Sequence, residues 1–402
     1  MQKSAPSAEG KPSTAMQPIH KSHHRIERPP FECIALVLQG GGALGAFQGG
    51  VYQALAEAHL QPDWVAGISI GAINAALIAG NSPEKRVEKL RAFWERVTTP
   101  VIADMPDIVK SFWSGDMARG YFNQLNAWSA LMRGAPGFFV PRPIPPQLHP
   151  AGTIEATSYY DTSQLRSTLE ELVDFDRINA GEMRFSVGSV NVRTGNFTYF
   201  DSNTHDIGPE HILASGALPP GFPPVEIEGE IYWDGGLVSN TPLQWVVSGG
   251  ARQDTLAFQI DLWSARGEAP HDIPEVMGRQ KEIQYSSRTR AGTDQFKTIQ
   301  RVRAALADLF DRLPPSELQG EDIDLLRSIA DRKVYRIVQL IYRSKHYERQ
   351  SKDYEFSRLS MQDHWQAGYN DAVRTLRHPE ALERPTNRTG CATFDLGVDG
   401  RD

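Results

Sequence analysis

Two short apolar runs, Cys33 to Leu38 and Trp64 to Ile68, each end in a glycine-containing turn that leads into helix-forming residues. Strand–turn–helix units of this kind build parallel sheets whose faces are covered by helices. The alternation of strand-like and helix-like segments continues to about Trp263. The sequence therefore predicts an α/β fold with a largely parallel central sheet.

The two turns, together with a later Asp-Gly-Gly, supply the groups that acyl transfer requires. They are Gly40-Gly41-Gly42-Ala43-Leu44-Gly45, Gly67-Ile68-Ser69-Ile70-Gly71 and Asp234-Gly235-Gly236. In Gly-x-Ser-x-Gly the glycines permit a sharp turn that presents the serine hydroxyl at a helix N-terminus. We therefore expect Ser69 to be a nucleophile and Asp234 to accept its proton. The backbone N–H groups of Gly40, Gly41, Gly42 and Ile70 are predicted to bind the oxyanion.

Each of these motifs has a second interpretation. Gly40, Gly42 and Gly45 also fit the G-x-G-x-x-G fingerprint of dinucleotide-binding proteins, which needs an acidic residue at the end of the second strand. Here that strand ends in Ile68-Ser69 and the acidic residue, Asp63, lies at its start, so the nucleotide interpretation is disfavoured. Asp234 could belong to an ordinary turn, because Asp-Gly is a common turn dipeptide.

Composition excludes several classes of function. The net charge of -7 argues against a general nucleic-acid-binding protein, which would normally be basic. Only two cysteines occur, Cys33 and Cys391, so a disulfide framework is not expected and a reducing compartment fits better. No run of 18 or more apolar residues is present, so no apolar segment has the length that a bilayer-spanning helix needs. We therefore expect a cytoplasmic protein that contacts membranes, if at all, only peripherally.

Changes in composition suggest boundaries along the chain. The predicted parts are a disordered arm (1–30), an α/β domain (31–265), a mostly helical C-terminal extension (270–378) and a disordered tail (379–402). Residues 100–158 interrupt the α/β pattern with aromatic residues, among them Phe112, Trp113, Phe138 and Phe139. Such an insertion can be a lid over a site or an irregular segment that packs its own aromatic side chains.

A locally basic stretch from Arg332 to Lys352 offers a second route to a lipid surface. Its cations could lie on anionic lipid, or they could form an ordinary solvated face with the neighbouring acidic residues. The cations are Arg332, Lys333, Arg336, Arg343, Lys345, Arg349 and Lys352.

From Ile34 to Leu262 the chain resembles the patatin-like phospholipase family in three ordered motifs: the glycine-rich loop, the serine elbow and the late Asp-Gly-Gly, which is followed by Asn240 and Pro242. The resemblance implies a three-layer α/β/α fold and a lipid acyl hydrolase with Ser69 as nucleophile, Asp234 as general base and Gly40 to Gly42 as oxyanion hole. It implies acyl esters of phospholipids and related lipids as substrates, and no metal cofactor for the dyad itself. Gly45, Gly67, Gly71, Gly235 and Gly236 complete the motifs.

The sequence departs from the family pattern at Leu44, where many members have Arg or Lys. The segment after Pro270 resembles an extension of unknown function that follows the patatin domain in some bacterial members.

Two rival functions stay open. The first is an α/β-hydrolase with a Ser-His-Asp triad, for which His205, His211, His346 and His364 lie downstream of Ser69. The glycine loop after the first strand and the serine after the second come earlier than that fold places its elbow. The second rival is a non-catalytic lipid-binding or regulatory module built on the same scaffold.

Overall fold

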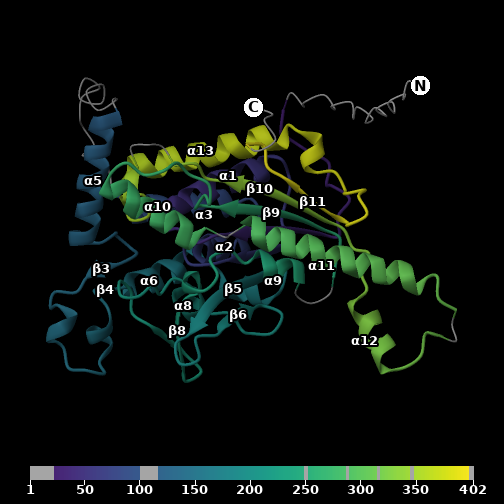
Figure 1. Cartoon of the computed structure of the whole chain (residues 1–402). Coiled ribbons are helices and arrows are strands. Elements are labelled where there is room, and N and C mark those ends of the chain that lie inside the picture. The colour runs from purple at the N-terminus through teal and green to yellow at the C-terminus, as the bar shows by residue number, and fades with distance from the viewer. Residues whose placement is uncertain are drawn as a thin grey trace, which may run out of the picture.

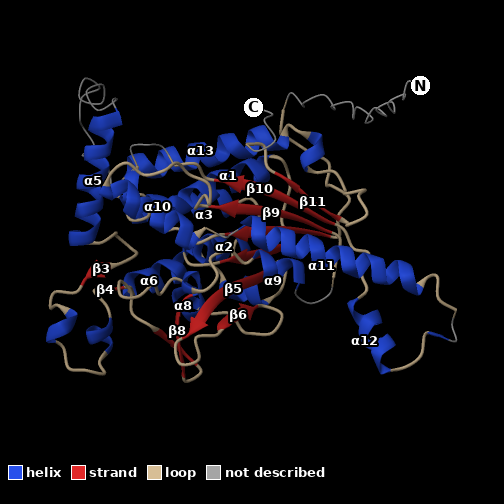
Figure 2. Ribbon diagram, in the orientation of Figure 1, coloured by secondary structure: helices blue, strands red, loops and turns tan. Residues whose placement is uncertain are grey.

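A nine-stranded sheet, covered by helices on both faces, forms the centre of the molecule (Figures 1 and 2). The structure is a computed structural model that describes residues 22–99, 116–248, 252–286, 289–314, 317–344 and 348–397. Most of the predicted N-terminal arm lies outside these residues, as do Phe112, Trp113 and His346.

The sheet is parallel except at one edge, and its strand order is β11-β10-β9-β1-β2-β5-β8-β7, with β6 also paired to β5. The pairs from β11 through to β5 are parallel, whereas β6, β7 and β8 run antiparallel to their neighbours. The strands are β1 (Cys33–Leu38), β2 (Trp64–Gly67), β5 (Arg184–Asn191), β6 (Phe197–Asp201), β7 (Val225–Ile227), β8 (Glu230–Asp234), β9 (Thr255–Asp261), β10 (Tyr335–Ile341) and β11 (Cys391–Phe394). This confirms the predicted α/β fold with a largely parallel sheet.

Alternating side chains of β1 show why the fold has three layers. Ile34, Leu36 and Leu38 belong to one buried cluster with residues of α1, α2, α3 and α13. Cys33, Ala35 and Val37 belong to a second cluster, with α9 and Phe296 of α11. Since successive side chains of a strand point to opposite faces, an apolar run with no polar interruption needs cover on both sides.

The helices are assigned as follows. They are α1 (Ala46–Glu57), α2 (Ile70–Ala79), α3 (Arg86–Val97), α5 (Asp116–Arg133), α6 (Ser163–Leu172), α7 (Phe175–Asn179), α8 (Pro209–Ser215), α9 (Leu243–Ser248), α10 (Ile273–Tyr285), α11 (Thr289–Phe310), α12 (Glu321–Ile329) and α13 (Arg358–Leu376). None of these helices has the length and apolar character needed to cross a bilayer.

Strands β2 and β8 share one edge of β5, and this arrangement positions the candidate site. Strand β6 pairs with β5 over Ser186 to Val190 and so occupies the opposite edge. Along the shared edge, β2 ends where Gly67 pairs with Val187, and β8 takes over where Asp234 pairs with Ser189. The chain that leaves β2 toward Ser69 is therefore directed to the end of β8.

The C-terminal extension contributes two strands to the same sheet, and the predicted domain boundaries stay a prediction. Strand β10 pairs with β9 along its whole length, and β11 pairs with β10 at the sheet edge. The tail predicted to be disordered after residue 378 contains β11 at Cys391–Phe394, so that prediction is wrong for these residues. The two cysteines are both buried and unpaired.

The insertion at 100–158 is partly helical. Helix α5 is followed by a short antiparallel pair, β3 (Val140–Pro141) and β4 (Tyr160–Asp161). Phe138 and Phe139 are buried and contact Phe222 and Phe356, as expected of an insertion that packs its own aromatic residues. Its role as a lid stays a prediction.

Within the basic stretch, the described cations mostly face acidic partners. Arg332 pairs with Asp308 and Asp311, Lys333 with Glu32, and Lys352 with Glu282. Their contacts match those of a mixed-charge face.

Candidate active site

Ser69 lies between β2 and α2 in a strained backbone conformation. Its φ is 55° and its ψ is −124°, a region that residues other than glycine rarely adopt. The Ser69 N–H donates to the hydroxyl of Ser215 (3.0 Å), which in turn donates to the Gly188 carbonyl (2.7 Å). These bonds from α8 and β5 hold the strained turn. The Ser69 residue itself is half-buried.

The glycines beside the serine are explained by close backbone approach. A Cβ at Gly67 would lie 2.2 Å from the Gly71 carbonyl oxygen, and one at Gly71 would lie 2.3 Å from the Leu38 carbonyl oxygen. Any side chain at either position would force the turn apart. The Gly-x-Ser-x-Gly pattern is thus a packing requirement of this strand-to-helix turn.

Asp234 ends β8 and is almost completely buried, with 2% of its surface exposed. Its carboxylate accepts a hydrogen bond from the Gly236 N–H (2.7 Å). Burial raises the pKa of the Asp234 carboxyl to about 7, against the lowering effects of the Gly236 N–H and of the Ser69 side chain. No ion pair of Asp234 occurs among the described residues. A carboxyl of this kind can exchange a proton near neutral pH.

The glycine loop passes beside Ser69. A Cβ at Gly40 would lie 3.0 Å from the Ser69 Cβ. The Gly40 N–H donates to the Asn240 carbonyl (3.2 Å), which removes Gly40 from the predicted donors of the oxyanion hole. The N–H groups of Gly41, Gly42 and Ile70 have no acceptor within the part of the chain that the structure describes.

Several polar side chains hold this loop in place, and the sequence analysis did not predict their role. Gln39 accepts from the N–H groups of Leu262 and Trp263, while the Trp263 indole and the Asn240 amide both donate to the Gly40 carbonyl. On the far side of the loop, Asn74 of α2 donates to the Gly45 carbonyl (2.9 Å). Gln39, Asn74 and Trp263 stand in no recognisable sequence motif. Asn240 is the exception, because it follows the Asp-Gly-Gly motif.

Leu44 and the histidines of the rival hypothesis lie in other environments. Leu44 is fully buried in the core. His205 contacts Thr204, His211 contacts Gly208, and His364 lies 3.4 Å from Glu348. No described histidine contacts the Ser69 side chain. A Ser-His-Asp triad therefore has no support in this geometry.

Asp63 also lies away from the glycine loop. It contacts Arg28 and the Ile34 N–H at the amino end of the sheet. A dinucleotide site would need an acid at the carboxyl end of β2.

Models of known protein families match two parts of the chain. A family model described as patatin-like phospholipase matches residues 36–247, which include the glycine loop, Ser69 and Asp234. A second model, described as patatin phospholipase, matches residues 283–388 of the C-terminal extension.

Individual relatives match only a short stretch. Patatin-like phospholipase domain-containing protein 7 of Rattus norvegicus is 36% identical over 85 residues, 20% of this chain and 6% of that protein. Patatin-like phospholipase domain-containing protein 6 of Homo sapiens is 40% identical over 75 residues, 19% of this chain and 6% of that protein. Lysophospholipase nte1 of Aspergillus terreus is 45% identical over 67 residues, 16% of this chain and 4% of that protein.

Among solved structures, VipD from Legionella pneumophila aligns with a TM-score of 0.37 and 14% identity. The alignment covers 96% of this chain and 77% of VipD.

Proposed function

The chain belongs to the patatin-like phospholipase family, and from this premise we propose that it is a lipid acyl hydrolase that uses Ser69 as nucleophile and Asp234 as general base. The observation that carries the proposal is the placement of a strained serine, directly after β2, beside the buried carboxylate that ends β8 on the same edge of β5. Burial raises the pKa of that carboxyl to about 7. A base is most effective when its pKa lies near the working pH.

In the proposed reaction, the Ser69 hydroxyl oxygen attacks the carbonyl carbon of an acyl ester while Asp234 takes the hydroxyl proton. The carbonyl oxygen becomes an oxyanion, for which the N–H groups of Gly41, Gly42 and Ile70 are the available donors. The bond to the leaving alcohol then breaks, and the alcohol oxygen takes the proton from Asp234. Water, deprotonated by Asp234, then attacks the acyl carbon. The bond to the Ser69 oxygen breaks, that oxygen takes the proton back from Asp234, and the carboxylic acid is released.

An acyl chain finds apolar surface close to Asp234. Leu237 and Val238 follow the Asp-Gly-Gly directly and are 42% and 59% exposed. Both side chains are large and apolar, and they lie three and four residues beyond the proposed base. Exposed apolar residues next to a polar centre fit a substrate with a hydrocarbon tail.

The proposal is tested by incubating the purified protein with a total lipid extract and measuring the products by mass spectrometry. Wild type should release free fatty acid and the corresponding lyso- or alcohol product, and Ser69→Ala should release neither. A fluorophosphonate probe should label wild type at Ser69 in parallel.

The non-catalytic alternative has a distinct outcome. Folded wild-type protein that binds lipid vesicles, yet is not labelled and turns over no lipid, would identify a binding module in place of a hydrolase. Circular dichroism of the same sample establishes that the protein is folded.

A further inference from the structure

The last carbonyl of α10, in the C-terminal extension, contacts the glycine loop at its start. The Tyr285 carbonyl accepts hydrogen bonds from the Gln39 side chain (3.2 Å) and from the Asn240 side chain (2.9 Å). Carbonyls at a helix C-terminus lack intrahelical partners and carry partial negative charge. Two side-chain amides that flank Gly40 therefore satisfy the end of a helix that is remote in sequence.

A second backbone group of the extension contacts the other side of the loop. The Asp353 carbonyl accepts from the Ala43 N–H (2.8 Å). The approach is so close that a Cβ at Gly42, whose φ is +56°, would lie 2.1 Å from that oxygen. The two free N–H donors, Gly41 and Gly42, thus lie between two points held by the extension.

An ion pair links these two points. The Lys281 ammonium lies 2.8 and 2.9 Å from the Asp353 carboxylate oxygens and also donates to the Gln350 carbonyl (3.2 Å). Lys281 lies one helical turn before Tyr285 on the same helix, α10. One helix therefore holds the start of the loop through Tyr285 and its end through Lys281 and Asp353.

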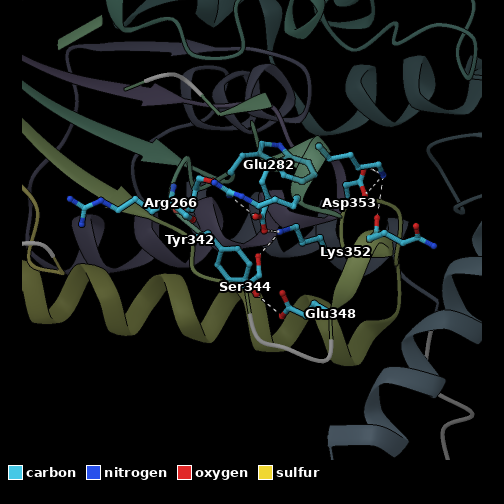
Figure 3. A network of polar contacts seen from close by, with 12 residues as sticks. Arg266, Glu282, Tyr342, Ser344, Glu348, Lys352 and Asp353 are labelled. Carbon is cyan, nitrogen blue, oxygen red and sulfur yellow. Dashed lines mark hydrogen bonds and ion pairs between the residues drawn. The ribbon is translucent and has the colours of Figure 1, made fainter. Parts of the chain in front are cut away.

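A second, more buried ion pair fixes the same segment to the same helix (Figure 3). Lys352, whose side chain is 3% exposed, pairs with Glu282 (2.6 Å) and contacts Ser344. Its ammonium also lies 5.1 Å from the ring of Trp263, whose indole donates to the Gly40 carbonyl. Burial raises the pKa of the Tyr285 hydroxyl, and the charges of Asp234 and Asp353 raise it further.

We propose that Lys281 is a positioning residue: through its ion pair with Asp353, the C-terminal extension holds the donors of Gly41 and Gly42 in place for the reaction at Ser69. This inference rests on the proposed function and assigns a role to the extension that the family comparison leaves open. Positioning errors of about 1 Å can cost roughly a hundredfold in rate, so a clamp on this loop acts on catalysis.

The test replaces Lys281 by methionine, which keeps the side-chain length and removes the charge. Removing the whole extension would instead delete β10 and β11 from the sheet. Lys333→Met is the matched control. Lys333 also ties the extension to the α/β core through a bidentate pair, 2.7 and 2.8 Å from the Glu32 carboxylate, but at the opposite end of the sheet.

Two measurements are made on each full-length variant: the rate of fluorophosphonate labelling at Ser69, and hydrogen–deuterium exchange of the peptide that contains Ala43. Lys281→Met should label about tenfold to a hundredfold more slowly, with faster exchange at Ala43. Lys333→Met should match wild type in both. Asp353→Asn combined with Lys281→Met should lose no more than Lys281→Met alone, because both changes remove one pair.

Unchanged exchange at Ala43 in Lys281→Met, or equal effects of both methionine variants, would overturn the inference. Exchange needs no activity, so it decides the positioning role even if wild type is never labelled. Absence of labelling in folded wild type would instead count against the proposed function.

Discussion

The carboxylates at the amino end of the parallel sheet and the candidate base at its carboxyl end lie in opposite environments. At the amino end, Glu32, Asp63 and Asp254 each face a cation: Lys333, Arg28 and Arg384. At the carboxyl end, Asp234 is buried and has no cation partner among the described residues, whereas Asp353 and Glu282 of the nearby extension are paired with lysines. Hydrogen bonding to Lys333 lowers the pKa of Glu32, whereas burial raises that of Asp234 to about 7. Ion pairs stabilise the carboxylates of the amino end, whereas Asp234 has no such partner and keeps a raised pKa that suits a proton acceptor.

Removing each kind of carboxylate tests this difference most strongly. Asp234→Asn keeps the side-chain shape but removes the proton acceptor, so kcat/KM should fall about 10²- to 10⁴-fold. The matched control is Asp63→Asn at the amino end of β2, which should keep wild-type activity. Equal activity of the two variants in a lipid-release assay would contradict the role given to Asp234.

Glycines at the two ends provide the next test. Gly42→Ala should lower kcat by roughly a hundredfold, because the added methyl group must displace the Asp353 carbonyl and with it the loop. Gly181, before β5 at the amino end, has a similar positive φ of +76°, but a Cβ added there would meet nothing within 4 Å among the described residues. Gly181→Ala carries the same backbone strain without the clash, so it should lose stability but not kcat. A comparable drop in kcat for both would assign the effect to strain alone.

The pH dependence of the reaction should report the buried carboxylate. Asp234 must be ionised to accept the serine proton, so kcat/KM should fall about tenfold per pH unit below an apparent pKa near 7. The profile is measured with a neutral ester, so that substrate ionisation does not contribute. A flat profile from pH 5 to 8 would show that a group with an ordinary carboxyl pKa serves as base.

The α/β half of the fold could be predicted from local patterns. Cys33–Leu38 and Trp64 onward are uninterrupted apolar runs bounded by glycine turns, and the structure places β1 and β2 there. Strand β11 could not be predicted in the same way, because Cys391–Phe394 is four residues long at a sheet edge within a polar tail. Its strand geometry depends on pairing with β10.

The residues of the candidate site also differ in whether a local sequence pattern identifies them. Ser69 and Asp234 can be identified from the glycines beside them, which form recognisable motifs. Gln39, Lys281 and Asp353 do not, because their partners lie far away in the sequence; Lys281 and Asp353 are 72 residues apart. A lysine or aspartate in a charged segment has the composition of a solvated face, and only the fold brings such residues to the loop.

The smallest expected effect of replacing these carboxylates is on the free energy of unfolding. This effect compares the amino and carboxyl ends of the sheet directly. The native pKa of Asp234 lies above its unfolded value, so its contribution to stability is fully present below about pH 4 and is lost as pH rises through 7. Asp234→Asn removes that loss, and its unfolding free energy relative to wild type should rise by roughly 2 to 4 kcal/mol between pH 5 and 8. Urea unfolding at both pH values measures it.

Glu32→Gln supplies the opposite case. The lowered pKa of Glu32 means that its stabilisation is present above its unfolded pKa and is lost only as pH falls through the native value. Between pH 5 and 8 Glu32 is ionised in both the folded and the unfolded state, so Glu32→Gln should differ from wild type by a constant amount. A difference in unfolding free energy from wild type that depends on pH for Glu32→Gln, or one that is constant for Asp234→Asn, would contradict the opposite pKa shifts of these two carboxyl groups.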